Sequence, residues 1–203
     1  DYAGVCGITK EEMLTAMSDY INDFAEAQEI TREETIEGLK RQYDGYHFTW
    51  PSPDVFNPFS LLNAFQDHDY TNYWFSSGTP TYLIEMLRKF NVVPSDINQM
   101  QALASDFDAP TENMSSITPL LYQSGYVTIK DFDKATRLYT LDIPNGEIRV
   151  GLMDSLLPKY VERCKEEGNT TIAKLCLALL NDDLDEMFRL LQACTLYTTD
   201  AAD

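Results

Sequence analysis

The sequence lacks the patterns that mark the commonest phosphate and metal chemistries. It contains no Gly-Lys pair, so it cannot form the Gly-x-x-x-x-Gly-Lys-Ser/Thr loop that holds nucleotide phosphates. No Asp or Glu is followed two residues later by Lys, which excludes a nuclease centre that holds Mg²⁺ with an Asp and a Glu-x-Lys pair. No apolar run approaches the roughly 20 residues that span a bilayer. We therefore predict no catalytic residue, no cofactor and no membrane segment in this chain.

Positive charge is also scarce. Lys and Arg number 15 against 33 Asp and Glu, which gives a net charge of −18, and no three basic residues are consecutive. Affinity for nucleic acid depends largely on Lys and Arg that neutralise phosphates. The average field of this chain would repel a phosphate backbone. The composition therefore disfavours nucleic-acid binding.

Cysteine and histidine are too few and too scattered for a metal site. No two cysteines form a Cys-x-x-Cys pair, and only two histidines are present. Asp67-His68-Asp69 are consecutive residues, which cannot converge on one helix face. The acidic residues at 182–186 lack the Gly and the final Glu of a calcium loop. We predict no metal ligand, and reduced cysteines in a cytoplasmic protein. These cysteines and histidines are Cys6, Cys164, Cys176, Cys194, His47 and His68.

Aromatic side chains, in contrast, are abundant between Gln42 and Pro80. Tyr, Phe and Trp account for 11 of these 39 residues. Rings left in water forfeit a large burial energy. Asp-Gly, Pro-Ser-Pro, Asn-Pro and Gly-Thr-Pro interrupt the stretch, so it cannot be one helix or one sheet. We predict a compact aromatic core against which short helices pack. Its proposed members are Tyr43, Tyr46, Phe48, Phe59, Trp74 and Phe75.

Periodicity and capping signals predict a mostly α chain with one β-hairpin. Thr9 with Glu12, and Thr31 with Glu34, have the spacing of a capping box. Asn57-Pro58 and Thr79-Pro80 each place an N-cap before a proline at the first helical position. Alternating residues predict the two strands of the hairpin. The predicted helices cover about 10–28, 31–43, 58–66, 80–90, 117–124, 147–163 and two segments of 171–194, and the strands cover 126–131 and 138–143.

Three ordered phrases resemble a known family. They are Tyr43-Asp44-Gly45-Tyr46-His47-Phe48, the run from Val55 to Phe65, and the run from Tyr73 to Leu83. In wording and order they are similar to the bacterial AAA-ATPase-like family, which is common in Bacteroidetes. Its members join a P-loop ATPase-like region to a PD-(D/E)XK nuclease-like domain. The resemblance implies structural roles for Tyr43, Asp44, Gly45, Tyr46, Phe48, Asn57, Pro58, Phe59, Trp74, Phe75, Gly78, Thr79 and Pro80.

The resemblance covers the middle segment of that architecture. It implies a helical lid-like part of the ATPase-like region at 1–110. The predicted order of helix, two-stranded hairpin and helix is typical of a winged-helix module and indicates such a module at 111–163. Residues 164–203 would be a helical lead-in to a nuclease-like domain that is absent here. On this interpretation the chain is non-catalytic and couples an ATPase core to the nuclease-like domain. ATP and Mg²⁺ are then implied for the parent protein alone, and the partners of this segment are its intramolecular neighbours.

Two other functions remain open. The 42–80 stretch could be a stand-alone protein-interaction module, which aromatic rings exposed within it would favour. The 111–163 module could be a DNA-binding winged helix, which a basic helix would favour and the net charge disfavours. Arg41, His47 and Arg88 are candidate nucleotide contacts, although a hydrogen-bonded structural role explains His47 more simply, and surface or helix-pairing roles explain the two arginines.

Overall fold

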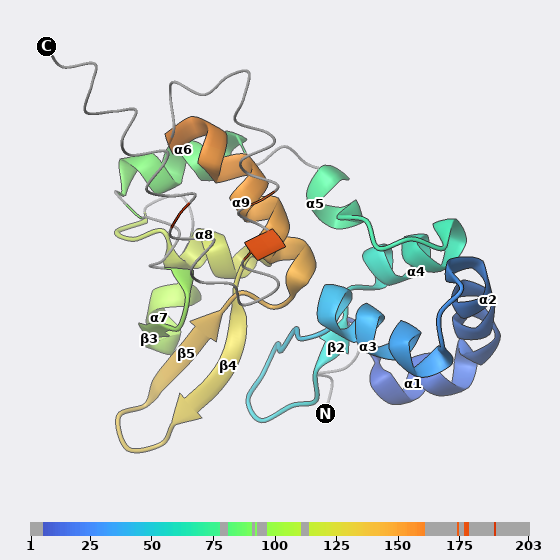
Figure 1. Ribbon diagram of the computed structural model, residues 1–203. Coiled ribbons are helices and arrows are strands. Elements are labelled where there is room, and N and C mark those ends of the chain that lie inside the picture. Colours follow the sequence, from blue (N-terminus) through green and yellow to red (C-terminus); the bar gives the residue numbers. More distant parts are fainter. Residues whose placement is uncertain are drawn as a thin grey trace, which may run out of the picture. The chain divides into compact units, whose positions relative to one another are not determined.

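The computed structural model describes residues 6–77, 81–90, 92, 97–110, 114–160, 174, 177–178 and 189. The chain divides into two compact units, residues 1–151 and 152–203, and every contact discussed below lies within the first. Figure 1 labels the elements, whose order is β1 (Ile8–Thr9), α1 (Lys10–Ala16), α2 (Ser18–Gln28), α3 (Arg32–Tyr43), β2 (Val55–Phe56), α4 (Pro58–Asp67), α5 (Tyr73–Ser77), α6 (Thr81–Lys89), β3 (Met100–Ala102), α7 (Ala104–Phe107), α8 (Thr118–Gln123), β4 (Thr128–Asp133), β5 (Leu138–Asp142) and α9 (Gly146–Tyr160).

Capping residues start the first helices where the sequence predicts. The Thr9 hydroxyl accepts a hydrogen bond from the Glu12 amide, and the Glu12 carboxylate accepts one from the Thr9 amide. Thr31 makes the same reciprocal pair with Glu34 at the start of α3. Asn57 accepts hydrogen bonds from amides in the first turn of α4. These contacts satisfy amides that have no partner within the helix.

The predicted helix over 10–28 is two helices. α1 ends at Ala16 and α2 begins at Ser18, because Met17 between them leaves the helical region with φ −114° and ψ 20°. The apolar periodicity continues across this break, so the pattern alone could not reveal it. Both helices still present their apolar faces to one core.

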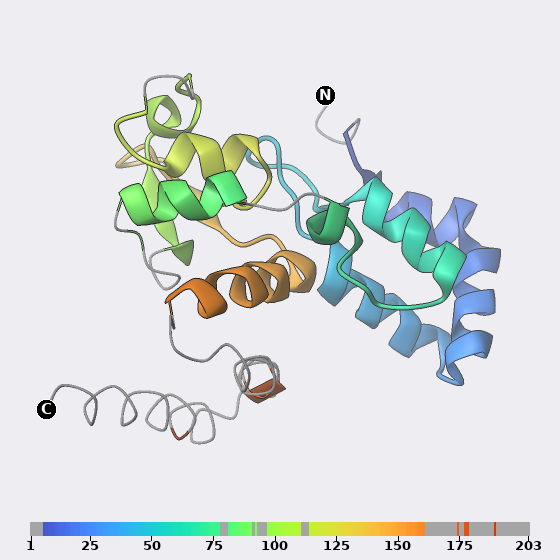
Figure 2. The same cartoon turned by 90° about the horizontal axis from the view of Figure 1, so that it is seen from above.

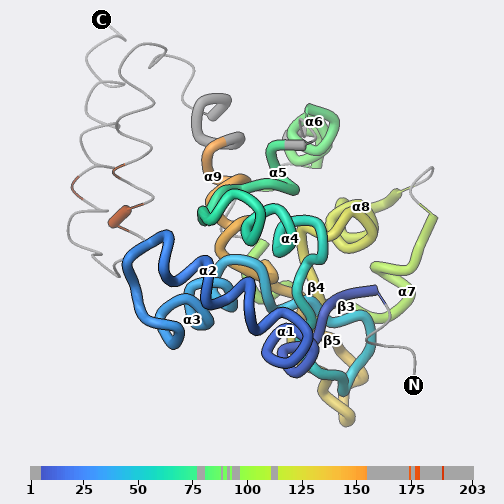
Figure 3. The backbone as a smooth tube through the Cα atoms, turned by 90° about the vertical axis from the view of Figure 1, so that its right-hand side faces the viewer, coloured from blue at the N-terminus to red at the C-terminus, as the bar shows by residue number. Residues whose placement is uncertain are grey.

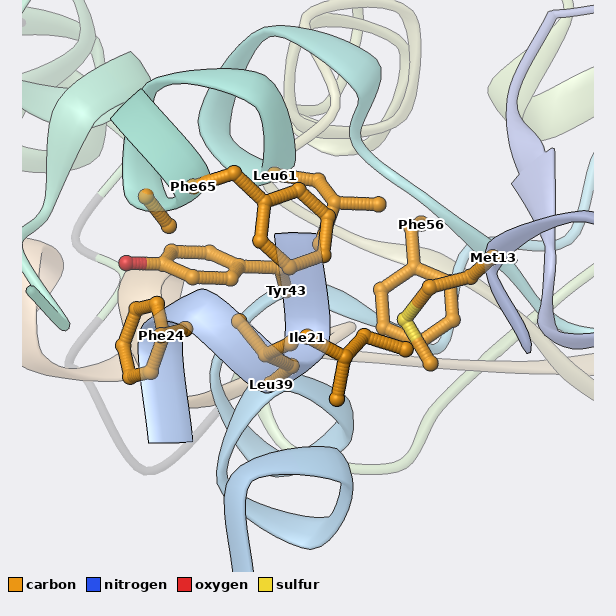
Figure 4. Close-up of a cluster of buried hydrophobic side chains, with 9 residues drawn as sticks. Met13, Ile21, Phe24, Leu39, Tyr43, Phe56, Leu61 and Phe65 are labelled. Atoms are coloured by element: carbon orange, nitrogen blue, oxygen red, sulfur yellow. The ribbon is translucent and has the colours of Figure 1, made fainter. Parts of the chain in front are cut away.

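That core joins the first four helices and β2, and Figure 4 shows its side chains in contact from several directions. In Figure 2, α2, α3 and α4 lie side by side, as the shared core requires. Burying each large side chain stabilises the fold by roughly 1.5–3 kcal/mol relative to leaving it exposed. The members are Met13, Ile21, Phe24, Leu39, Tyr43, Phe56, Leu61, Ala64 and Phe65.

Two antiparallel sheets accompany the helices. In the first, Ile8 of β1 pairs with Phe56 and Thr9 pairs with Val55, and Tyr46 forms a further bridge with Val55. The second has the strand order β3-β5-β4 (Figure 1), and Figure 3 gives a side view of the same elements. β5 lies in the middle, with Met100 of β3 and Ile129 of β4 both paired to its Leu141.

The prediction of a mostly α chain is therefore wrong, since the described residues form a mixed α/β structure with two small antiparallel sheets. The hairpin strands lie close to their predicted ranges at 128–133 and 138–142. The sequence analysis missed β3, which adds a third strand to that hairpin, and the pairing of β1 with β2. Strands of two or three residues are too short to show an alternation of apolar and polar residues. Whether they form depends on contacts with residues distant in the sequence.

The proposed division at 110 and 163 stays a prediction. The helical lead-in at 164–203 lies almost entirely outside the described residues. Among the described helices, none combines the length and the apolar composition needed to cross a bilayer.

Neighbouring leucines in α4 give a matched test of the core. Leu61 is fully buried, whereas Leu62 is 53% exposed. We expect Leu61→Ala to lower the free energy of unfolding by about 2–5 kcal/mol, because it leaves a cavity. Leu62→Ala should change it by less than about 0.5 kcal/mol. Urea denaturation of both variants measures this, and equal losses would contradict the assigned burial.

Candidate functional site

The turn after α3 is fixed by contacts from the second half of the unit. Gly45 has φ +102°, and a Cβ there would lie 2.3 Å from the Pro144 carbonyl oxygen. The Lys130 ammonium, at 2.6 Å, donates a hydrogen bond to the Gly45 carbonyl and lies 3.4 Å from that of Pro144. Burial lowers the pKa of Lys130 because its charge is partly removed from water. Only glycine fits this left-handed, crowded position without strain.

The next two residues are held by the segment that leads into β4. Thr128 bonds the backbone of His47 in both directions: its hydroxyl accepts from the His47 amide and donates to the His47 carbonyl, each at 2.8 Å. The Tyr46 hydroxyl lies 3.3 Å from the Gly125 carbonyl oxygen, to which it donates. Burial raises the pKa of Tyr46, so the hydroxyl stays protonated as a donor.

A third contact centres on Glu147, whose side chain is fully buried. One carboxylate oxygen accepts from the Ser60 hydroxyl of α4, and the other accepts from the Trp74 amide of α5, both at 2.7 Å. The Phe75 amide also bonds this carboxylate. Glu147 therefore caps α5 from outside it, since these amides lack partners within the helix. Burial raises the pKa of Glu147, and these hydrogen bonds oppose that shift.

Beside these contacts lies a cavity of about 340 Å³. Rings from β2, α5, α8 and the turn after α3 supply much of its wall, and no Asp, Glu, Lys or Arg lines it. Its volume is at the small end of the usual range for ligand pockets. The lining residues are Cys6, Tyr46, His47, Phe48, Val55, Phe56, Asn57, Pro58, Trp74, Tyr122, Gln123, Ser124, Gly125, Val127 and Thr128.

The imidazole of His47 is nearly enclosed. Its Nδ1 atom lies 3.2 Å from the Asp54 carboxylate, but the two groups are not aligned for a hydrogen bond. The contact is therefore an ion pair only when the imidazole is protonated. The ring also packs against Trp50, with centroids 5.3 Å apart. His47 is thus held by its backbone and its ring contact.

The aromatic residues of 42–80 do not all join one core. Tyr43, Tyr46 and Phe75 are buried, and Trp74 is partly buried. Phe48 is 45% exposed and Phe59 is 49% exposed, so their predicted place in the core is wrong. The physical reason is that neither side chain belongs to the buried cluster that joins the helices. Phe48 lines the cavity, and Phe59 lies in the first turn of α4.

The other motif residues have local roles where the structure describes them. Asp44 ends α3 and accepts a hydrogen bond from the Gly45 amide. Asn57 caps α4, and Pro58 occupies its first position. Gly78, Thr79 and Pro80 lie outside the described residues.

The three candidate nucleotide contacts are not brought together by any described contact. His47 lines the cavity. Arg41 is exposed in the last turn of α3, where its charge acts on the Tyr70 hydroxyl. Arg88 belongs to α6, and its side chain lies outside the described part of the structure. Within the described residues, no group of three or more His, Cys, Asp or Glu is placed to hold a metal ion.

Sequence reasoning missed the residues that hold the 42–80 stretch from outside it, namely Thr128, Lys130 and Glu147. Thr128 and Lys130 belong to a predicted strand, in which threonine and lysine are ordinary residues. Glu147 follows Asn145-Gly146, a typical helix start, where an acid is common. An acid between Ile143-Pro144 and Ile148 was the one available signal of a buried carboxylate.

Comparison with known proteins gives one relative and no activity. The chain is 29% identical over 183 residues to a protein of Azotobacter chroococcum described only as uncharacterised and in the vnfD 5′ region. The match covers 89% of this chain and 33% of that protein, so the chain spans about a third of the relative's length. No family model and no solved structure match the chain.

Thr128 offers a clean test of the contact to His47. Thr128→Val keeps the shape but leaves the His47 amide and carbonyl without their partner. We expect a loss of about 1–3 kcal/mol per unsatisfied group in the free energy of unfolding. Thr128→Ser keeps the hydroxyl and should retain most of the stability. If chemical denaturation gives the same stability for both variants, the hydroxyl contacts do not matter.

Glu147 should give a pH dependence that can be isolated. Its pKa is raised in the folded state, so its contribution to stability is complete below the ordinary value of 4.5 and is lost as pH rises through the raised value. Glu147→Gln keeps the shape and can still pair with the Trp74 amide and the Ser60 hydroxyl. We expect the wild type to lose stability relative to this variant as pH rises from 4.5. Denaturation at a series of pH values measures the difference, and a constant difference would refute the assignment.

Proposed function

We propose that this chain is a non-catalytic connector within a longer protein. The observation that carries the proposal is the set of contacts between the 42–80 stretch and residues 125–147. Gly45, His47 and Trp74 are each bonded through their backbone to a side chain from that later segment. Two parts of the chain separated by more than 70 residues are thereby fixed to each other.

These contacts suit a connector because their groups are buried or partly buried. A displaced Glu147 would leave amides of α5 and the Ser60 hydroxyl without partners, at about 1–3 kcal/mol for each group. Displacing residues 125–147 therefore costs less free energy when the 42–80 stretch moves with them. Force or movement that reaches residues 125–147 is passed to the stretch that follows α3.

The resemblance to the AAA-ATPase-like family supplies the proposed neighbours. In that architecture an ATPase core would precede the segment and a nuclease-like domain would follow it. The relative in Azotobacter is about three times as long as the matched region, which is compatible with such neighbours. The absence of a Gly-Lys pair supports the non-catalytic role of the chain itself.

DNA binding by the hairpin has less support. Of its three basic residues, Lys130 is engaged with backbone carbonyls inside the unit. Lys134 and Arg137 are exposed, but so are Asp131 and Asp133. Two positive charges beside two negative charges give little counterion release on contact with phosphates.

The test uses the full-length protein. We expect ATP to change the hydrogen-exchange protection of the region after residue 203 in the wild type. Thr128→Val should reduce that response while ATP binding upstream is retained, because the connection is loosened and not the nucleotide site. Thr128→Ser is the matched control and should keep the response. An undiminished response in Thr128→Val would contradict the connector.

A second function, a protein-interaction module, is favoured by a separate observation. Phe48, Phe59 and Leu62 of the 42–80 stretch are all about half exposed. When a partner covers large apolar side chains that are exposed to water, their burial contributes to the free energy of binding. In this role the stretch binds another polypeptide instead of, or in addition to, connecting neighbours.

A further inference from the structure

We propose that the cavity beside Tyr46 and Phe48 binds an uncharged aromatic side chain presented by a peptide segment. This inference rests on the second proposed function, the protein-interaction module, and names the chemistry of its partner. It does not depend on the connector.

Aromatic rings surround the cavity from separate parts of the unit. Tyr46 and Phe48 come from the turn after α3, Phe56 from β2, Trp74 from α5 and Tyr122 from α8. Such walls favour an aromatic guest, because ring pairs contribute about 0.5–1.5 kcal/mol beyond the area that they bury. The wall is also held in place, since Tyr46 is bonded to Gly125 and its neighbour His47 to Thr128. A largely preformed site binds with a smaller cost of ordering.

Tyr46 and Phe48 form the part of the wall that can accept a ring. Their planes are 11° from parallel, and their centroids are 6.5 Å apart. Carbon atoms in contact are about 3.5–4.0 Å apart, so the two rings are not in full face-to-face contact. Phe48 is 45% exposed, whereas Tyr46 is buried. The exposed part of the Phe48 ring is therefore available for contact with a guest ring.

The lining determines what kind of ring is bound. No Asp, Glu, Lys or Arg lines the cavity, so it offers no ion pair to a charged guest. A nucleotide would bring phosphates that find no cation there, and burying an unpaired charge is costly. A volume of about 340 Å³ suits one anchoring side chain better than a large cofactor. Aromatic side chains are also the commonest anchors of protein interfaces.

The charge of the chain constrains the residues on either side of the anchor. With a net charge of −18, the protein repels an acidic segment and attracts a basic one. The expected occupant is therefore a peptide with a central aromatic residue and neutral or basic flanks.

The test measures binding of short amidated peptides to the 203-residue chain by calorimetry or by chemical-shift changes. The probes are Lys-Gly-Trp-Gly-Lys, its Leu-centred and Glu-flanked versions, and free N-acetyltryptophanamide. We expect saturable binding of the first peptide with a Kd of about 0.1–1 mM, as befits a single anchor. The Leu-centred and Glu-flanked peptides should bind at least about threefold more weakly, and so should the free ring.

Two matched variants locate the site. Phe48 lines the cavity and Tyr82 of α6 does not, yet both are about half exposed. Phe48→Ala should raise the Kd of the Trp-centred peptide by about three- to tenfold. Tyr82→Ala should leave the Kd of this peptide unchanged.

Other results would overturn the inference. They are the absence of saturation up to about 10 mM, which is weaker than any useful anchor, equal binding of the Leu-centred peptide, and equal losses in the two variants. Equal binding of the free ring would instead indicate a small-molecule site and would also refute a peptide partner. None of these results concerns the connector, whose separate test is the response to ATP in Thr128→Val.

Discussion

The structure of the first unit depends on a carboxylate that has no access to water. Glu147 lies at the start of α9 and accepts hydrogen bonds from α4 and α5. A buried charge of this kind is tolerated only when donors surround it, and its partners cannot leave without a large cost. The position of α5 is therefore set by an acid more than 70 residues later in the chain. Removal of this side chain would leave the Ser60 hydroxyl and the Trp74 amide without the partner that the carboxylate provides.

The remaining contacts are arranged around that one. Lys130 holds the turn that contains Gly45, and Thr128 holds the strand-like segment at His47. Tyr46 then faces the cavity with its hydroxyl already bonded. The cavity is thus a result of the same contacts that join the two parts of the unit. Binding in the cavity can be tested apart from the connection of the parts through Phe48, which lines the cavity and makes none of the hydrogen bonds described above.

Local signals in the sequence predicted the helix starts well, because a capping box or an Asn-Pro pair determines nearby backbone directly. The hairpin was also visible, since its strands are long enough to alternate. Met17 shows the limit of periodicity, as the apolar pattern continues through a break in the helix. The short strands β1, β2 and β3 exist because of partners far along the chain, and a mostly α fold was therefore predicted wrongly.

The candidate site was also predictable only in part, because contacts between distant residues leave no local signal in the sequence. The density of rings identified 42–80, but not which rings are buried, because Phe48 and Phe59 have the same composition signal as Tyr43 and Phe75. Thr128 and Lys130 gave no signal at all, since both are ordinary residues in a strand. A cavity is formed by surfaces from several elements, so its lining cannot be read from one stretch.

The contacts that join the two parts share a further property. On the side of the aromatic stretch, most are made by backbone groups: the Gly45 carbonyl, the His47 amide and carbonyl, and the Trp74 amide. The hydroxyls of Tyr46 and Ser60 are the side-chain exceptions. On the other side they are made by the side chains of Lys130, Thr128 and Glu147. Much of the chemical identity needed for the junction is therefore encoded after residue 127. The 42–80 stretch supplies mainly a backbone path, together with Gly45 and the hydroxyls of Tyr46 and Ser60. Side chains such as those of His47 and Phe48 are free to diversify toward whatever the cavity binds, without loss of the junction.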